Sequence, residues 1–171
     1  MDNENQITMY KLKVATVNDI EDIWTIIEKT WLEGQITGIE RKELINKLHL
    51  THSINKIKLE ILYSYQRYIL IEEKNNSVAF ASYSVSGGHP PDFRIHKIYN
   101  LPSTEGKGYN RILIAHIETL ASSRGCRKLS VIVRNQDKKE YFESLGFTAA
   151  DHPETPQGIS ESGYTMVKVL G

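Results

Sequence analysis

HKIYNLPSTEGKGYNR, the stretch from His96 to Arg111, joins an extended apolar run, a turn with two glycines and the start of an amphipathic helix. Proline removes a donor from a β-ladder, so the run is expected to end as a strand at Pro102. Gly106 and Gly108 allow positive φ angles just before apolar residues at helical spacing. The stretch therefore predicts a strand, a tight turn and a helix in immediate succession.

The turn is a candidate anion site. The backbone amides between Gly106 and Arg111 are left uncovered, and the positive end of the helix dipole lies beside them. This combination suits a phosphate or a diphosphate. A plain strand-to-helix connection has the same pattern, so the segment alone leaves both interpretations open. The Lys-Ser/Thr ending of a nucleotide-binding P-loop is missing.

Two motifs in the chain resemble those of the GCN5-related N-acetyltransferases, the GNAT superfamily. The segment IYNLPSTEGKGYNRILI is similar to the acetyl-CoA motif of that family, which follows a strand that ends in a Leu-Pro pair. The strand Leu129 to Val133, followed by Asn135 and by a helix that ends in Gly146-Phe147, resembles the next motif. The resemblance covers about Arg67 to Phe147, and the N-terminal third matches only in layout.

The resemblance implies acetyl-CoA as cosubstrate and a set of residues that bind it. The backbone of the strand end would bind the pantetheine amides, the turn would bind the diphosphate, and Asn135 would hold the coenzyme from the facing strand or cap a helix. The implied coenzyme-binding residues are Ile98, Tyr99, Asn100, Glu105, Gly106, Lys107, Gly108, Tyr109, Asn110, Arg111, Asn135 and Phe142.

Three residues depart from the family pattern. Glu105 stands where the family carries Gln or Arg, and a like-charge contact at 4 Å costs about 1 kcal/mol in water. Lys107 is expected to offset that charge. Asn110 replaces a small residue and Asn100 replaces an apolar one. We therefore expect coenzyme binding that is weaker than usual but still based on backbone donors.

The catalytic groups are the least certain part of the pattern. Many relatives use a tyrosine to protonate the leaving thiolate, and the matching position here is Phe142. Either another group or water donates that proton, or the chain binds coenzyme without much turnover. His96 is the first candidate for the base, because histidine titrates near neutral pH. A strand histidine that bonds the backbone is the alternative, and Asp92 and Glu33 are weaker candidates.

Composition limits the remaining functions. The 171 residues suit one domain over 9–171 after a frayed start at 1–8, and 21 basic residues balance 21 acidic ones. This balance gives no support for nucleic acid or membrane as a partner. The single Cys126 fits a reducing cytoplasm. His49 and His52 lack an obvious third ligand, so we expect no metal.

Periodicity predicts the other elements. Strands are expected at 9–15, 67–73, 78–85, 93–100, 128–133, 147–150 and 163–170, with a hairpin turn at Asn75-Asn76-Ser77. Helices are expected at 20–31, capped by Thr16 or Asn18, and at 40–50, 53–65, 111–123 and 136–145. As the resemblance implies, this is an α/β (α+β) fold: a mixed, mostly antiparallel sheet of about six to seven strands, flanked by helices on both faces.

The function implied by the resemblance is direct transfer of an acetyl group to a primary amine of a small molecule, polyamine-like or amino-acid-like, or of a peptide. Trp31, Glu33, Gln35 and Ile36 are candidate acceptor contacts, whereas Trp24 is expected to pack in the core, which is also the alternative for Trp31. The alternative is a non-catalytic or weakly active acyl-CoA-binding module of the same fold. The acceptor and a homodimer are left open.

Overall fold

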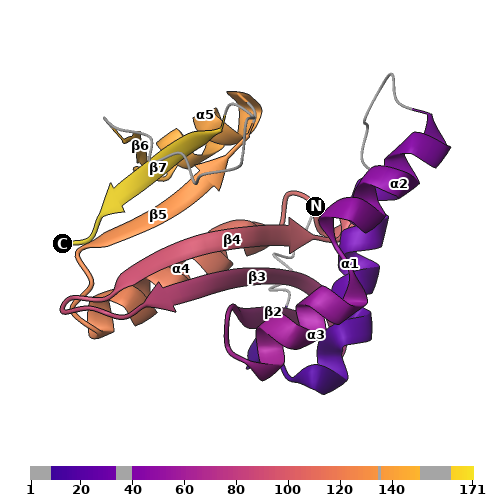
Figure 1. The fold of residues 1–171 in the computed structure, drawn as a ribbon, viewed down its shortest axis with the longest axis horizontal. Helices are drawn as coiled ribbons and strands as arrows, with labels where there is room; N and C mark the ends of the chain where they lie inside the picture. The colour runs from indigo at the N-terminus through magenta and orange to yellow at the C-terminus, as the bar shows by residue number, and fades with distance from the viewer. Residues whose placement is uncertain (1–8, 34–39, 135, 151–162) are drawn as a thin grey trace, which may run out of the picture. The chain divides into compact units, whose positions relative to one another are not determined.

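The computed structural model describes residues 9–33, 40–134, 136–150 and 163–171, so the predictions for 1–8, Gln35, Ile36 and Asn135 fall outside it (Figure 1). Its elements are β1 (Lys11–Val14), η1 (Val17–Asp19), α1 (Ile20–Glu33), α2 (Arg41–Thr51), α3 (Ile54–Leu62), β2 (Arg67–Glu73), β3 (Asn76–Ser86), β4 (Asp92–Asn100), η2 (Pro102–Thr104), α4 (Tyr109–Ser123), β5 (Lys128–Val133), α5 (Gln136–Ser144), β6 (Thr148–Ala149) and β7 (Tyr164–Val169).

The strands form a seven-stranded sheet in the order β1-β2-β3-β4-β5-β7-β6. β4 and β5 are parallel, with a register from Phe93↔Leu129 to Ile95↔Val131, as a crossover through α4 requires. β1 with β2, β5 with β7 and β6 with β7 are antiparallel. The predicted fold class, a mixed and mostly antiparallel sheet with helices, is confirmed.

Residue contacts divide the chain into two compact units. Unit 1 comprises 1–82 and 98–113, and unit 2 comprises 83–97 and 114–171. β3, β4 and α4 have residues in both units. The prediction of a single domain over 9–171 stays a prediction.

Unit 1 has its core where α1 packs beside α2 and α3 and against two strands. The apolar residues of α1 recur every three or four positions, so Ile23, Ile26 and Ile27 share one fully buried face. Tyr68 and Phe80 supply the strand side of this core, with Trp24 and Trp31 packed at its margin. Trp24 therefore packs as predicted, and Trp31 packs beside the same core.

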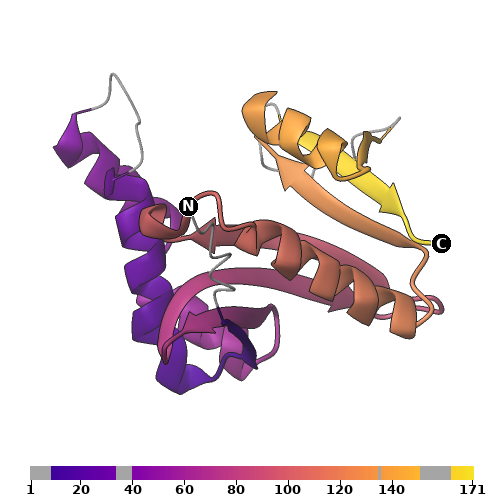
Figure 2. The same ribbon diagram turned by 180° about the vertical axis from the view of Figure 1, so that it is seen from behind.

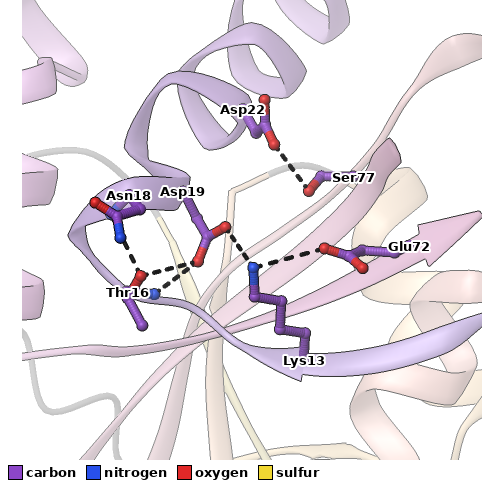
Figure 3. Close-up of polar contacts among 7 residues, drawn as sticks. All are labelled: Lys13, Thr16, Asn18, Asp19, Asp22, Glu72 and Ser77. Atoms are coloured by element: carbon purple, nitrogen blue, oxygen red, sulfur yellow. Dashed lines mark hydrogen bonds and ion pairs between the residues drawn. The ribbon is translucent and has the colours of Figure 1, made fainter. Parts of the chain in front are cut away.

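Thr16, one of the two predicted caps, caps η1, the short helix that runs directly into α1. Its side chain accepts from the Asn18 amide, and Asp19 accepts from the Thr16 amide at 2.8 Å, which completes a capping box (Figure 3). Lys13 donates to Asp19 at 2.8 Å and lies 3.7 Å from Glu72, which joins β1 to this cap and to β2. Burial alone would raise the pKa of Asp19, but the hydrogen bonds from Lys13 and Thr16 outweigh it and lower the pKa.

Asp19→Asn is expected to lower the free energy of unfolding by about 1 to 2 kcal/mol at pH 7, because it weakens the cap and removes the charge that Lys13 binds. Lys13 is 38% exposed, so water screens the ion pair and the cap hydrogen bonds supply most of the loss. The Asp19 pKa is lowered on folding. The Asp19 carboxylate therefore contributes to the free energy of unfolding above the unfolded pKa of about 3.9. This contribution is lost as the pH falls through the lowered pKa of the folded state.

Urea unfolding at pH 7 and pH 3 measures this prediction. Asp22→Asn is the matched control, since Asp22 accepts only an exposed bond from Ser77 at 3.2 Å (Figure 3). That control should change stability by less than about 0.5 kcal/mol. An Asp19→Asn loss that is equal at both pH values would contradict the linkage to Asp19.

Unit 2 contains the pair β5 and β7, with α5 lying over them (Figure 2). Phe142 of α5 packs edge-on against Phe147, with ring centroids 5.2 Å apart. Gly146, at φ +94°, ends this helix in the left-handed conformation that glycine favours. Lys168 pairs with Glu118 at 2.8 Å and so ties β7 to α4.

Several element boundaries differ from the sequence prediction, and three of them concern a turn, the start of a helix and a short strand. The β2–β3 turn is centred on Lys74 and Asn75, at φ +49° and +64°, one residue earlier than predicted. A turn with two consecutive positive φ angles matches the right-handed twist of the two strands that it joins. Ser77, which was predicted to lie in the turn, belongs to β3. α4 begins at Tyr109 rather than Arg111, and the strand expected at 147–150 shortens to β6.

Among the described residues, no helix is both long and apolar enough to cross a membrane.

Candidate functional site

The predicted strand, turn and helix are present within unit 1. β4 ends at Asn100, η2 follows, and a turn from Glu105 to Gly108 leads into α4. Gly106 and Gly108 have φ angles of +84° and +77°, so both need glycine or one of the few residues that tolerate this region. A Cβ added at either glycine would have no neighbouring atom within 4 Å. The turn therefore faces open space.

The turn also presents unpaired backbone donors. The amides of Glu105 and Lys107 donate to Pro102 and Thr104, and the Ile112 amide closes the first turn of α4 onto Gly108. No acceptor among the described residues pairs with the amides of Gly106, Gly108, Tyr109, Asn110 and Arg111. These donors and the positive end of α4 form a site for an anion. We call this segment, 105–111, the amide cradle.

Glu73, at the end of β2, holds the amide cradle in place. Its Oε1 accepts from Lys107 at 2.8 Å and from the Tyr109 hydroxyl. These two hydrogen bonds lower the pKa of Glu73, so the carboxylate stays charged at neutral pH. Burial, reinforced by the bond to Glu73, raises the pKa of Tyr109, which stays protonated.

This contact corrects one prediction. Lys107 was expected to offset the charge of Glu105, but its ammonium group is paired with Glu73. Glu105 lies exposed at the start of the turn. The sequence carries no signal for the pair, because β2 and the turn are 34 residues apart along the chain.

The two asparagines that depart from the family pattern bond to each other. Asn110 Nδ2 donates to Asn100 Oδ1 at 3.1 Å, and Asn100 Nδ2 donates to the Leu101 carbonyl at 3.1 Å. Among the described residues, nothing donates to the buried Asn110 Oδ1. The pair fixes the strand end to the first turn of α4, so the departures compensate each other in part.

A double-mutant cycle tests this coupling. Asn100→Leu is expected to destabilise by about 1 to 2 kcal/mol, because it leaves the Asn110 amide without its acceptor. Asn110→Ala should lower the free energy of unfolding by a smaller amount, because it also removes a buried oxygen to which nothing donates. The double variant should be about 1 kcal/mol more stable than the sum predicts, as measured by urea unfolding.

Thr51→Ala, on exposed α2, serves as the control for additivity in this cycle. Combined with Asn100→Leu, it should give additive losses within about 0.5 kcal/mol. If the losses in the free energy of unfolding of Asn100→Leu and Asn110→Ala simply added up in the double variant, the two side chains would not be coupled.

The strand end predicted to bind the pantetheine arm carries a tyrosine held by α1 and α2. The Tyr99 hydroxyl accepts from Trp31 Nε1 at 3.4 Å and lies 3.2 Å from His52 Nε2, and its ring stacks on Phe80. Burial raises the pKa of Tyr99, and the Trp31 bond opposes this. The candidate acceptor residue Trp31 and the predicted coenzyme residue Tyr99 therefore come together, while Glu33 is the last residue of α1.

The two histidines considered for a metal lie against different aromatic rings. The ring centroids of His49 and Trp24 lie 5.7 Å apart, and those of His52 and Trp31 lie 5.7 Å apart as well. In the described part of the chain, no three His, Cys, Asp or Glu side chains gather as a ligand set.

Unit 2 holds the candidate base in a pocket of about 470 Å³. His96 is exposed on β4, and its Nε2 lies 2.7 Å from the Ser84 hydroxyl. Ser84 lies on the neighbouring strand β3, so this contact orients the imidazole ring. The catalytic role of His96 stays a prediction.

Phe142, the position of the family tyrosine, is 4% exposed and lies against Tyr141 and Phe147. Its ring carries no group that can donate a proton. The coenzyme roles predicted for Phe142, for the strand end and for the amide cradle stay predictions.

A family profile and several solved structures resemble this chain. A profile of the Acetyltransferase (GNAT) family matches residues 26–147, which is more than half of the chain. Comparison with curated protein sequences gives no significant match.

Solved structures share the fold. The PaiA N-acetyltransferase of Thermoplasma acidophilum, in complex with coenzyme A, has a TM-score of 0.78 and 14% identity, over 94% of this chain and 99% of that one. The ribosomal-protein-S18-alanine N-acetyltransferase of Escherichia coli has a TM-score of 0.63 and 16% identity, over 95% of each chain. The N-acetylglutamate synthase of Neisseria gonorrhoeae, with coenzyme A and N-acetyl-glutamate, has a TM-score of 0.67 and 20% identity, over 95% of this chain and 35% of that one.

Proposed function

The chain belongs to the acetyltransferase (GNAT) family, and from that premise we propose that it transfers the acetyl group of acetyl-CoA directly to a primary amine of a small molecule or a peptide. The names of the similar structures range from an N-acetylglutamate synthase to a ribosomal-protein-S18-alanine N-acetyltransferase, so family membership leaves the acceptor open. No metal takes part in the proposed reaction.

The amide cradle is the observation that carries the proposal. Its unpaired amides, the two glycines at positive φ and the open space in front of them fit a diphosphate. Side chains at Glu105 and Arg111 flank these donors with opposite charges. The coenzyme of one similar structure, the PaiA enzyme, carries such a diphosphate, which supports the assignment.

The residues of this chain have distinct roles in the proposed reaction. Acetyl-CoA supplies a thioester, and the backbone of Ile98 to Asn100 would hold its pantetheine arm as an added strand does. The acceptor amine forms the new C–N bond as the C–S bond breaks, and it must lose a proton. An ammonium group with a pKa near 10.4 is mostly charged at pH 7, so a base is required. We assign that role to His96, with Ser84 as its orienting partner.

Two measurements test the proposed function. Calorimetry should detect binding of CoA and acetyl-CoA to the folded chain, and a thiol-release assay should detect CoA only when a suitable amine is present. Amino acids, polyamines and short peptides make up the acceptor panel. Absence of any CoA binding to folded protein would overturn the proposal.

A second candidate function is an acyl-CoA-binding module with little turnover, and the buried Phe142 favours it. Phe142→Tyr separates the two, because it restores the hydroxyl that many relatives use as an acid. We expect turnover to rise about tenfold or more, within the range for one added general acid. Phe147→Tyr is the control for adding a hydroxyl to the same aromatic cluster, and it should not raise turnover. An unchanged rate in Phe142→Tyr would show that water or another residue already donates the proton.

We propose a cytoplasmic location, where Cys126 stays reduced. The thiol is 5% exposed and donates to the Lys128 carbonyl at 2.8 Å, so it packs as a small buried residue. A homodimer is the assembly to be tested by sedimentation velocity.

A further inference from the structure

The pocket of unit 2 lies on one face of the sheet. Side chains alternate between faces along a strand, and the Phe93 ring lies under Arg124, at the end of α4, 5.8 Å away. Its neighbour Arg94 therefore points to the other face, together with His96. Both residues line the pocket of about 470 Å³, within the size range of small-molecule sites.

Arg94 is held in place but has no counter-ion among the residues that the structure describes. Its Nε donates to the Ser130 hydroxyl at 3.4 Å, and that hydroxyl donates to the Phe93 carbonyl at 3.4 Å. No carboxylate of the described residues lies within ion-pair distance of the half-buried guanidinium group. A guanidinium group has five donors, so the planar end of this side chain remains available for a carboxylate.

The other charges of the pocket favour an anion. Lys128 lines the same pocket, and it too is unpaired with any carboxylate in the described part of the chain. Asp92 is the single carboxylate of the lining, against the two cations Arg94 and Lys128. A diamine would place a second positive charge beside these cations, whereas an acceptor with a carboxylate would neutralise one of them.

We propose that this pocket binds the carboxylate of the acceptor at Arg94 and presents the amine of the same molecule toward His96. The acceptor class is thus an amino acid or a short peptide with a free carboxylate, rather than a polyamine. This inference rests on the proposed function for the acetyl transfer, but its binding step does not require coenzyme.

The experiment compares each acceptor with its own amide. β-Alanine, lysine and triglycine are each paired with the carboxamide form, and putrescine represents diamines. At least one carboxylate form should have a kcat/KM about tenfold or more above its amide, the factor that a charge-assisted bond supplies. Arg94→Ala should bring that ratio close to one, and Arg94→Lys should retain part of it, since lysine keeps the charge but not the planar fork.

Arg67→Ala, at the exposed start of β2, is the matched control and should keep the full ratio. Melting curves and CoA titrations of each variant show whether the fold and the amide cradle are intact. Calorimetry without CoA provides a second readout, in which the preferred carboxylate probe binds the parent chain and loses about tenfold in affinity in Arg94→Ala.

Equal or better use of the amides or of putrescine would overturn the inference. So would a failure of every carboxylate probe to bind or to be acetylated by a chain that binds CoA. A chain that binds the carboxylate probe through Arg94 but does not bind CoA would retain the pocket assignment and overturn the proposed function instead.

Discussion

Replacing Gly108 with aspartate is expected to abolish the rise in melting temperature that acetyl-CoA gives. A ligand at about 100 times its Kd stabilises the native state by about 2.7 kcal/mol, or about 5 to 11 °C for a chain of this size. The carboxylate that Gly108→Asp introduces would project into the open space in front of the amide cradle, where the diphosphate is proposed to lie. Repulsion between the two anions then costs about 1 to 4 kcal/mol, depending on how much water remains.

Two controls isolate the charge from the backbone. Gly108→Asn has nearly the same shape and tolerates positive φ equally well, so it should retain part of the shift. Gly125→Asp places the same residue at φ +74°, also without an atom within 4 Å of its Cβ, but at the end of α4 in unit 2. It reports the cost of the conformation alone and should keep the full shift. If acetyl-CoA raised the melting temperature equally in the parent chain, Gly108→Asp, Gly108→Asn and Gly125→Asp, the amide cradle would have no part in the proposed function.

Replacing His96 with alanine is expected to lower kcat/KM by about 10²- to 10⁴-fold, the contribution typical of general acid–base catalysis. Coenzyme affinity should not change, because His96 lines the pocket around Arg94 and is not one of the residues of the amide cradle. Loss of the acidic limb of the pH–rate profile would identify His96 as the base. The thiol-release assay with the preferred acceptor measures both quantities.

Ser84→Ala should give a smaller loss, about tenfold, since it removes the partner that orients the ring but leaves the imidazole group. His116→Ala, on α4 and outside the pocket lining, is the control and should keep the parent rate. A His96→Ala variant with the parent rate and pH profile would remove His96 from the mechanism.

Local patterns in the sequence predicted most of the fold. The Thr16 cap and the glycine turn depend on interactions between residues close in sequence. The strands β2 and β5 carry clear local residue patterns, and their predicted boundaries agree with the structure. The position of the hairpin turn was missed, because Asn75-Asn76 and Lys74-Asn75 both contain a residue that tolerates positive φ. The choice between them depends on strand register, which the whole sheet decides.

The site was less predictable, because its contacts join distant residues. The glycines marked the amide cradle, but nothing near Lys107 indicates that Glu73 would pair with it. The resemblance identified Asn100 and Asn110 as separate departures and gave no reason to pair them. The pocket around Arg94 brings together side chains of four strands, and a linear pattern does not show which side chains meet across a sheet.

The bond between Asn100 and Asn110 also constrains how the chain can diverge. Substitution of Asn100 alone leaves the Asn110 amide in the interior with no acceptor, and substitution of Asn110 alone removes the donor to Asn100 Oδ1. A route to the apolar and small residues of the family therefore passes through a less stable intermediate. Orthologues should therefore exchange both residues or neither. The two positions are then expected to covary. A chimera that takes β4 from one lineage and α4 from another should fold poorly unless it keeps both asparagines or replaces both.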